Sequence, residues 1–314
     1  MSEIRINIKT ITFIILCFVA QLTQAQDWPR TFENADGTQT VIEKPPQRIL
    51  STAVSVTGTL LAIDAPVVAS ATTMAGDYFA QWQSLAKQRG VEALWPAGSV
   101  DLESAYAVAP DLIVVSTSGA DSALAQVEEF KMLAPTIVVD YTDVSWQQLA
   151  KQLAQATGQE QAAKDNIAQF NQLVKTTRDS IQLPEGKTNI VSFQGAGVVN
   201  AIAKPLGTHA QLLKSLGFDI EMPKPEWQSG PISHRDFMRV HYENLTELTA
   251  PTTFLLSRGR NDIQAFTKDP VLQNLPSIQA QQVYGLGENS FRIDLFSARE
   301  IVNNIAQIFS QKSD

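Results

Sequence analysis

The amino-acid sequence predicts an α/β protein built from two Rossmann-like lobes with parallel sheets, joined by one long rigid helix. Short apolar runs alternate with amphipathic stretches along the chain, which is typical of parallel sheets covered by helices. One long amphipathic segment, residues 159–181, lies near the middle of the chain. A pattern of helix, proline and apolar strand occurs once on each side of that segment. Together these observations favour two lobes over one.

Residues 1–25 are predicted to be a secretory signal peptide and not part of the fold. Arg5 and Lys9 precede an apolar run over residues 11–20, and small residues stand at positions −3 and −1 before Gln26. The run is too short to cross a membrane as a helix. Cys17, the only cysteine, lies in this run, so the mature chain has no thiol for a disulfide, a nucleophile or a metal cluster. We therefore expect a protein exported to the periplasm.

Charge and motif content disfavour several classes of protein. The formal net charge is −8, whereas nucleic-acid-binding proteins are typically basic. Neither G-x-S-x-G nor H-E-x-x-H occurs, and the glycine loop at residues 193–197 lacks the third glycine of a dinucleotide-binding motif. We expect a monomeric binding protein that is not an enzyme, has no cofactor and binds no nucleic acid.

The first lobe is assigned to residues 26–158. Its short apolar runs are expected to form buried strands, and the amphipathic stretches that follow them are expected to form helices. The expected strands are residues 48–51, 67–70, 112–116 and 136–140. The expected helices are residues 56–63, 78–89, 121–133 and 146–157.

The segment 159–183 is predicted to be the helix between the lobes. Apolar or small residues recur in it at intervals of four and three residues, which places them in one stripe on about six helical turns. These residues are Ala163, Ile167, Phe170, Val174, Thr177 and Ile181. Gly158 separates the segment from the preceding helix, and Pro184 ends it. Such a helix is either a strut between two lobes or a covering helix of a single domain.

The second lobe is assigned to residues 184–314, with the same alternation. Its expected strands are residues 189–193, 252–257 and 281–284, and its expected helices are residues 208–216, 271–275 and 297–309. Residues 103–116 and 243–257 share the pattern of helix, proline and apolar strand, with Pro110 and Pro251 at matching places. This internal similarity favours the interpretation of residues 159–183 as a helix that bridges two lobes.

Several segments are similar to a known family: residues 48–52, 58–66, 109–114 and the pair Phe291-Arg292. They resemble the class III solute-binding proteins of ATP-driven importers, specifically those for ferric catecholate siderophores. The likeness extends from Asp27 to the final helix. It implies two lobes bridged by one helix, an enterobactin-like ferric siderophore in the cleft, and an inner-membrane permease as partner. The similarity is weakest over residues 193–233, where ligand specificity is expected.

The chemistry of that ligand indicates which residues could bind it. A ferric ion held by three doubly deprotonated catecholates carries three net negative charges and needs no metal ligand from the protein. Arginine supplies both a hydrogen-bonding cation and a flat stacking face. The crevice of a parallel sheet lies beyond the carboxyl ends of its strands, so residues that follow strands are favoured. The predicted ligand-binding residues are Arg292, Arg258, Arg260, Arg235, Arg239, Phe291, Trp82, Trp146, Thr52 and Ser55.

Each of these residues has an ordinary alternative role. A surface arginine is commonly a solvated charge, and a tryptophan is commonly part of a core. Thr52 and Ser55 precede a predicted helix whose free N–H groups favour an anion, but they could equally be N-caps. Arg292 is favoured because Phe291-Arg292 matches the family.

Glu103 and Glu243 begin the two copies of the internal pattern. The resemblance implies that an acidic residue at the tip of each lobe docks onto the permease, and these two glutamates fit that role. Their alternative is an interaction with the helix dipole.

Other ligands remain open on the same scaffold. Vitamin B12 or haem is the main alternative, although neither needs a cluster of arginines. A divalent-metal receptor is less favoured because His209, His234 and His241 all lie in the second lobe. A histidine or tyrosine could still complete the iron coordination of a ligand with two catecholates.

Overall fold

The computed structural model describes residues 28–142, 144–230, 236–260 and 262–310. The predicted signal peptide, His234 and Arg235 lie outside the described residues. None of the described helices is long and apolar enough to cross a membrane.

The first lobe contains a five-stranded parallel sheet with the order β5-β4-β3-β6-β7. Its strands are β3 (Ile49–Ser51), β4 (Val67–Thr72), β5 (Glu92–Pro96), β6 (Leu112–Ser116) and β7 (Thr136–Val139). Its helices are α1 (Val54–Ala62), α2 (Ala80–Gln88), α3 (Leu102–Ala107), the 3₁₀ helix η1 (Leu124–Gln126), α4 (Val127–Leu133) and α5 (Trp146–Thr157). Every residue of β6 and β7 is buried, as expected for strands covered on both faces.

A two-stranded hairpin, β1 (Arg30–Glu33) and β2 (Gln39–Ile42), lies beside the outer strand of this sheet. The loop of the hairpin is bonded to β7: the backbone N–H of Val138 donates to Asn34 Oδ1 at 2.8 Å, and Ala35 N–H donates to Val138 O at 2.8 Å. The hairpin therefore covers an edge that would otherwise be free to pair with another chain.

The second lobe contains a mixed sheet with the order β11-β9-β8-β12-β13, and β10 pairs with β8. Its strands are β8 (Lys187–Ser192), β9 (Asn200–Ala203), β10 (Asp219–Ile220), β11 (Phe237–Val240), β12 (Thr252–Leu255) and β13 (Val283–Gly285). The prediction of a parallel sheet is correct for β8, β10, β12 and β13 but wrong for β9, which pairs antiparallel with both β8 and β11. Only a short loop joins β8 to β9, and a short loop permits only antiparallel pairing.

The helices of the second lobe are α7 (Thr208–Ser215), the 3₁₀ helices η2 (Pro225–Trp227) and η3 (Tyr242–Glu247), α8 (Gln264–Thr267), α9 (Pro276–Gln279) and α10 (Leu295–Phe309). The predicted helix at 271–275 is wrong, because residues 271–274 form turns between α8 and α9. Pro276 instead begins α9, where its missing N–H has no helical partner to lose.

The two copies of the internal pattern lead into equivalent strands. β6 follows α3 and β12 follows η3, and each holds the fourth place in its five-strand order. The similarity seen in the sequence therefore corresponds to the same topological position in the two sheets.

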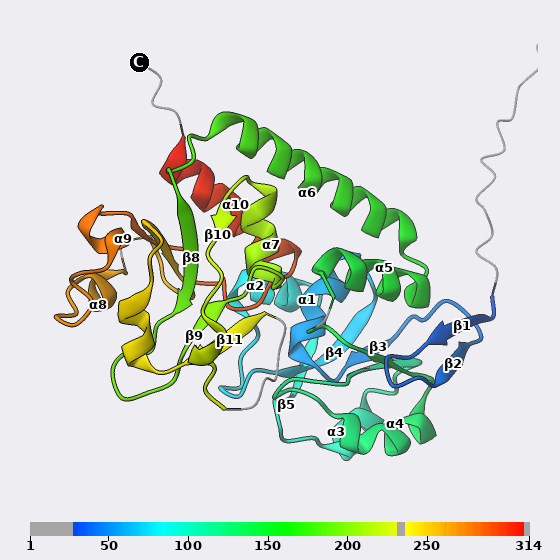
Figure 1. Cartoon of the computed structure of the whole chain (residues 1–314). Coiled ribbons are helices and arrows are strands. Elements are labelled where there is room, and N and C mark those ends of the chain that lie inside the picture. The colour runs from blue at the N-terminus through cyan, green and yellow to red at the C-terminus, as the bar shows by residue number, and fades with distance from the viewer. Residues whose placement is uncertain (1–27, 143, 231–235, 261, 311–314) are drawn as a thin grey trace, which may run out of the picture.

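Helix α6 (Glu160–Ser180) has 21 residues and extends over both lobes (Figure 1). Gly158 ends α5 in the left-handed conformation, with φ of 76°, which lets the chain turn into α6. The buried side of α6 carries Ala163, Phe170 and Val174, and it packs on α5 of the first lobe and α10 of the second. The predicted segment and the observed helix thus agree to within a few residues.

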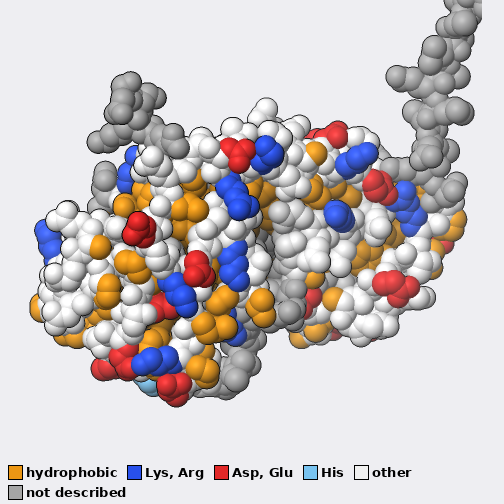
Figure 2. All heavy atoms as spheres, turned by 45° about the horizontal axis from the view of Figure 1, so that its top comes forward, with side chains coloured by type: hydrophobic (Ala, Val, Ile, Leu, Met, Phe, Trp, Pro, Cys, Tyr) orange, Lys and Arg blue, Asp and Glu red, His pale blue; other side chains and the backbone are white. Residues whose placement is uncertain are grey.

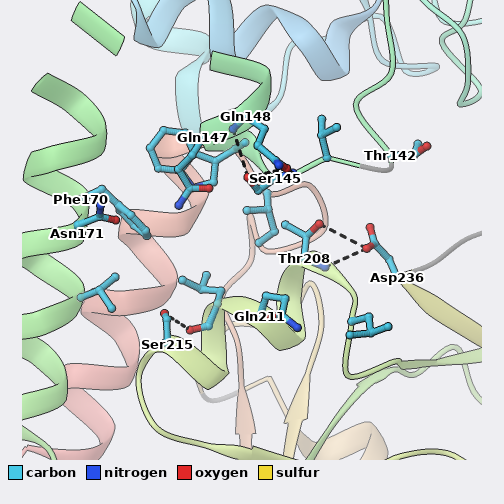
Figure 3. Close-up of a pocket in the computed structure, with 16 residues that line it drawn as sticks. Thr142, Ser145, Gln147, Gln148, Phe170, Asn171, Thr208, Gln211, Ser215 and Asp236 are labelled. Carbon is cyan, nitrogen blue, oxygen red and sulfur yellow. Dashed lines mark hydrogen bonds between the residues drawn. The ribbon is translucent and has the colours of Figure 1, made fainter. Parts of the chain in front are cut away.

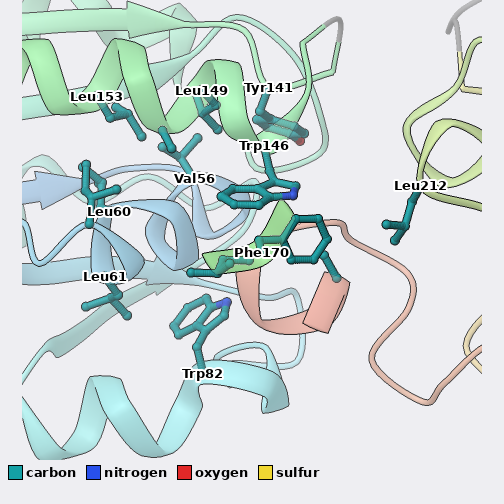
Figure 4. Close-up of a cluster of buried hydrophobic side chains, with 14 of the residues drawn as sticks. Val56, Leu60, Leu61, Trp82, Tyr141, Trp146, Leu149, Leu153, Phe170 and Leu212 are labelled. Carbon is teal, nitrogen blue, oxygen red and sulfur yellow. The ribbon is translucent and has the colours of Figure 1, made fainter. Parts of the chain in front are cut away.

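A second connection between the lobes lies at the start of α10. This helix contacts α1 and α2 of the first lobe, and Gln81 Nε2 donates to Asp294 Oδ2 at 3.1 Å. A Cβ on Gly58 would lie 2.6 Å from Trp82 Nε1 and 2.7 Å from Asp294 Oδ2, so α1 needs glycine here. One hydrophobic cluster runs through this region, and Figure 4 shows side chains from α1, α2, α5 and α6 meeting in it.

Candidate functional site: the cleft between the lobes

A cavity of about 640 Å³ lies between the two lobes. The first lobe contributes Val54, Ser55, Thr73, Met74, Ala75, Phe79, Ala97, Gly119, Ala120, Asp121, Tyr141 and Thr142, and the second contributes His209, Asp236, Phe237, Phe291 and Arg292. Its volume is in the range of small-molecule sites, and most of the lining is apolar or aromatic with a few polar groups, as such sites commonly are.

Arg292 lies in this cavity, in the segment between β13 and α10. Its guanidinium carbon is 4.5 Å from the ring centroid of Tyr141 in the first lobe and 5.6 Å from that of its neighbour Phe291. The Nε of Arg292 is buried and has no hydrogen-bond partner. Arg292 therefore stacks across the boundary between the lobes and places a cation in the cavity lining.

Asp121 holds the side chain of Tyr141 in place. Its hydroxyl donates to Asp121 Oδ1 at 2.7 Å, and burial raises the pKa of Tyr141 to about 12, so the hydroxyl keeps its proton. The other oxygen, Oδ2, accepts from the backbone N–H of Ser55 at 2.8 Å, at the N-terminus of α1. Gly119 has φ of +94°, and a Cβ there would lie 1.7 Å from the Tyr141 hydroxyl. The chain needs glycine at this position to admit the tyrosine.

His209 supports the loop that carries Phe291 and Arg292. Its Nε2 lies 2.7 Å from the carbonyl oxygen of Ser290. A carbonyl can only accept, so we assign the proton to Nε2. Burial lowers the pKa of His209 to about 4, so the ring is neutral at neutral pH, and its Nδ1 has no hydrogen-bond partner.

Two large apolar side chains stand exposed at the rim of the cavity, one from each lobe. Met74 is 75% exposed and Phe291 is 56% exposed. Phe79 and Phe237 lie deeper in the same lining. These groups offer apolar and aromatic faces on which a flat ligand group can pack.

A second cavity of about 580 Å³ continues the cleft toward α6 (Figure 3). It shares Thr142 and Asp236 with the first cavity. Neutral polar side chains of α5, α6 and α7 line it: Gln147, Gln148, Asn171, Gln211 and Ser215. Figure 3 shows Asp236 bonded to Thr208 at the start of α7.

The structure brings together three of the predicted ligand-binding residues: Arg292, Phe291 and Ser55 line the same cavity. Thr52 is buried, and its hydroxyl donates to the carbonyl of Val114 at 3.1 Å, so it faces a neighbouring strand.

The other predicted arginines with described positions lie outside the cavity lining. Arg258 donates to the carbonyl oxygens of Ser257 and Phe193, and its Nε is 3.9 Å from Asp262. Arg260 bonds to Gln307 and Asn304 of α10. Arg239 is exposed on β11.

Both predicted tryptophans are buried in the hydrophobic cluster. Trp82 is 1% exposed beneath α1. Trp146 is 4% exposed, lines the second cavity and contacts Phe170 edge-to-face at 5.2 Å.

Sequence reasoning missed Tyr141, Asp121, His209 and Asp236 as cleft residues. Tyr141 and Asp121 follow β7 and β6, so the rule that favours residues after strands applies to them. Sequence reasoning missed them because an anionic ligand favours arginines as its binding residues.

Among the described residues, no group of three or more His, Cys, Asp or Glu side chains could hold a metal ion. On the face shown in Figure 2, basic, acidic and hydrophobic side chains are interspersed rather than gathered by charge.

Two α/β lobes, one bridging helix and a ligand-sized cleft define a class III periplasmic binding protein. The chain belongs to the periplasmic binding protein family, whose model matches residues 49–290. It is 36% identical over 313 residues to the ferric enterobactin-binding periplasmic protein FepB of Escherichia coli, covering 96% of this chain and 98% of that protein. The resemblance found in the sequence is thereby confirmed.

Solved structures agree with this assignment. The crystal structure of holo-ViuP matches with a TM-score of 0.88 and 60% identity, covering 91% of this chain and 97% of that one. The catecholate-siderophore binding protein VctP of Vibrio cholerae matches with a TM-score of 0.63 and 18% identity, covering 89% and 98% of the two chains. At that identity the second match supports the fold alone.

Proposed function

We propose that this protein is the solute-binding component of an ATP-driven importer and carries a ferric catecholate siderophore in the cleft between its lobes. The observation that carries the proposal is Arg292, a cation stacked on Tyr141 in an aromatic-lined cavity shared by both lobes. The name of the relative FepB, which states ferric enterobactin as its ligand, supports the same ligand class.

The chemistry of the cleft suits such a ligand. The guanidinium of Arg292 can donate to catecholate oxygens, and the stacked arrangement with Tyr141 holds its plane in place. Phe291, Phe79 and Phe237 offer faces for the catechol rings. The ferric ion arrives with its coordination complete, so the protein binds the complex by its outer oxygens and rings.

We place this function in the periplasm. The family is periplasmic, and the apolar leader followed by small residues is the layout of an export signal. The cargo would then be transferred to a permease in the inner membrane.

A fluorescence titration tests the ligand class. Trp146 lines the second cavity, so its emission should respond to a chromophore bound in the cleft. We expect saturable quenching by ferric enterobactin and none by zinc chloride, cyanocobalamin or haem at the same concentrations. Saturable quenching by cobalamin or haem, without any by ferric catecholates, would assign the cleft to the alternative ligands.

We further propose that Glu103 and Glu243 dock onto the permease. Both are exposed in the first turn of α3 and η3, which precede equivalent strands of the two sheets. A pair of matching carboxylates, one on each lobe, suits a partner with arginines at matching places.

Uptake measurements test this docking role. Glu103→Ala with Glu243→Ala should abolish transport of the ferric siderophore and leave its dissociation constant unchanged. The control is Asp165→Ala with Asp179→Ala, which removes two exposed carboxylates from α6. Normal uptake by the first double variant would remove these glutamates from the docking role.

A further inference from the structure

Two helices, one from each lobe, begin at the cleft. Ser55 lies in the first turn of α1, Thr208 is the first residue of α7, and the next residue, His209, lines the cavity. The first N–H groups of a helix lack helical partners and carry a partial positive charge, so each of these ends favours an anion. An anionic ligand would be expected to use them.

Both positions are already occupied by carboxylates of the protein. Asp121 Oδ2 accepts from Ser55 N–H at 2.8 Å, and Asp236 Oδ1 accepts from Thr208 N–H at 2.9 Å. Asp121 is only 6% exposed, and its other oxygen accepts from the Tyr141 hydroxyl. The hydrogen-bond partners of both aspartates are donors, so each carboxylate serves as an acceptor.

Both aspartates also line the cavity. Among the described lining residues they face one cation, Arg292, so the described groups contribute more negative than positive charge. A fixed carboxylate repels a ligand in proportion to the negative charge of that ligand, and the repulsion is larger in a partly buried site than in water. Arg235 lies outside the described residues, so this charge balance counts the described residues alone.

Capping alone does not require this charge. Asp121 and Asp236 are distant in sequence from the helices they cap, and an asparagine at either place would keep a side-chain oxygen that can accept from the same N–H group. It would leave the cleft less repulsive to anions. The choice of aspartate on both lobes therefore has a consequence for the ligand beyond the stability of the helices.

We propose that Asp121 and Asp236 set the charge selectivity of the cleft and tune it toward ferric catecholate complexes with fewer than three net negative charges. The proposal rests on the function proposed above. It assigns the two aspartates a specificity role that is distinct from the binding role of Arg292.

The test compares two ligands of the same shape and different charge. Enterobactin loaded with a trivalent metal, Fe(III) or Ga(III), carries three net negative charges, whereas the Ti(IV) complex of the same ligand carries two. We expect the wild-type protein to bind the Ti(IV) complex more tightly than the Ga(III) complex. This arm uses the unaltered protein, so it stands even if a variant fails to fold.

The variants are Asp121→Asn, Asp236→Asn and the double variant. Each keeps a side-chain oxygen that can accept the helix N–H. We expect the double variant to bind the ferric and Ga(III) complexes about three- to tenfold more tightly, and the Ti(IV) complex with a smaller gain. The preference for the Ti(IV) complex should therefore shrink.

The matched control is Asp101→Asn. Asp101 caps α3 by accepting from the N–H of Glu103 at 3.0 Å, and it lies outside the cavity lining. It removes one carboxylate from a helix N-terminus in the same way and should leave both affinities unchanged. A wild-type protein without preference between the two complexes, or variants with an unchanged preference, would overturn the proposal. A wild-type protein that binds neither complex would instead contradict the proposed function.

Discussion

His209 links the first turn of α7 to the loop that carries Phe291 and Arg292. The bond from its Nε2 to the Ser290 carbonyl is buried, and burial lowers the pKa of the ring to about 4 from an ordinary value of 6.5. The folded protein therefore holds a neutral histidine where the unfolded chain would be protonated below about pH 6.5. The neutral ring holds the cleft loop through the bond from Nε2–H to the Ser290 carbonyl.

The sign of the pH dependence follows from this lowered pKa. The contribution of His209 to stability is fully present above the unfolded pKa of 6.5 and is lost as the pH falls toward the folded pKa of about 4. Across that window the loss can reach roughly 3 kcal/mol. We predict that His209→Gln, which can still donate to Ser290 O, loses less stability than wild type between pH 7 and about pH 4.5, measured by urea unfolding. His241→Gln, on the exposed His241, is the control; equal losses in wild type and His209→Gln would contradict the account.

Individual site residues could be predicted only in part. Arg292 was found because the Phe291-Arg292 pair matches the family and follows a strand. Arg258 and Arg260 also follow a strand, yet Arg258 turns to backbone carbonyls and Arg260 to α10. The sequence shows which residues leave a strand end, but the direction of each side chain depends on partners that are distant in the chain.

At the scale of elements, α1 shows how two lobes can constrain one helix. Gly58 lies inside α1, where alanine would ordinarily favour the helix by up to about 1 kcal/mol. Here a Cβ would meet Trp82 and the N-cap residue of α10, Asp294. The close approach of α1, α2 and α10 therefore requires glycine at position 58, although helix propensity favours alanine.

We predict that Gly58→Ala destabilises the protein by about 1–2 kcal/mol in spite of the gain in helix propensity, because overpacking costs more. Urea unfolding followed by tryptophan fluorescence measures it. Trp82→Phe removes the Nε1 atom nearest to the new Cβ, so the double variant should lose less than the sum of the two single losses. Additive losses, or a Gly58→Ala variant more stable than wild type, would show that the contact is not close.

Elements with strong periodicity were predictable from sequence. Helix α5 was predicted at residues 146–157, as observed, because its apolar face is regular and Gly158 ends it. Strands β9 and β11 were missed because they are short segments of four residues in which a polar residue, Asn200 or Arg239, interrupts the apolar pattern. The turns at residues 271–274 were mistaken for a helix because Val271, Leu272 and Leu275 have the spacing of apolar residues on one face of a helix.

At the scale of the whole molecule, two connections set the angle between the lobes. One is the continuous helix α6, and the other is the start of α10 packed against α1 and α2. Arg292 on Tyr141 adds a contact across the cleft itself. Such an arrangement cannot bend as a pair of flexible hinge loops does.

We predict that ligand binding closes the lobes only slightly. The radius of gyration from solution X-ray scattering should change by less than about 1 Å between the ligand-free and ligand-saturated protein. Measurement at several protein concentrations controls for association. A contraction of several ångströms would contradict the role of α6 as a rigid strut.

The two-lobe architecture was predictable because it follows from patterns that repeat over the chain. The strand–helix alternation, the long central helix and the repeated helix–proline–strand pattern can each be recognised even when a single strand or helix is predicted wrongly. The second contact, between α10 and the first lobe, was not predictable, because nothing in the sequence near Asp294 indicates that it packs against Gly58 and Gln81.

The central claim is that Arg292 binds an anionic ferric siderophore in the cleft, and the dissociation constant of ferric enterobactin tests it most directly. Arg292→Ala removes a charged hydrogen bond of roughly 1.5–3 kcal/mol, so affinity should fall about tenfold to a hundredfold. Arg292→Lys should recover only part of the loss, because an ammonium lacks the fork and the stacking face. Arg260→Ala, outside the cavity lining, should bind as wild type does, and melting temperatures confirm that each variant is folded. If Arg292→Ala is folded and binds as tightly as wild type, Arg292 does not bind the ligand and the account is wrong.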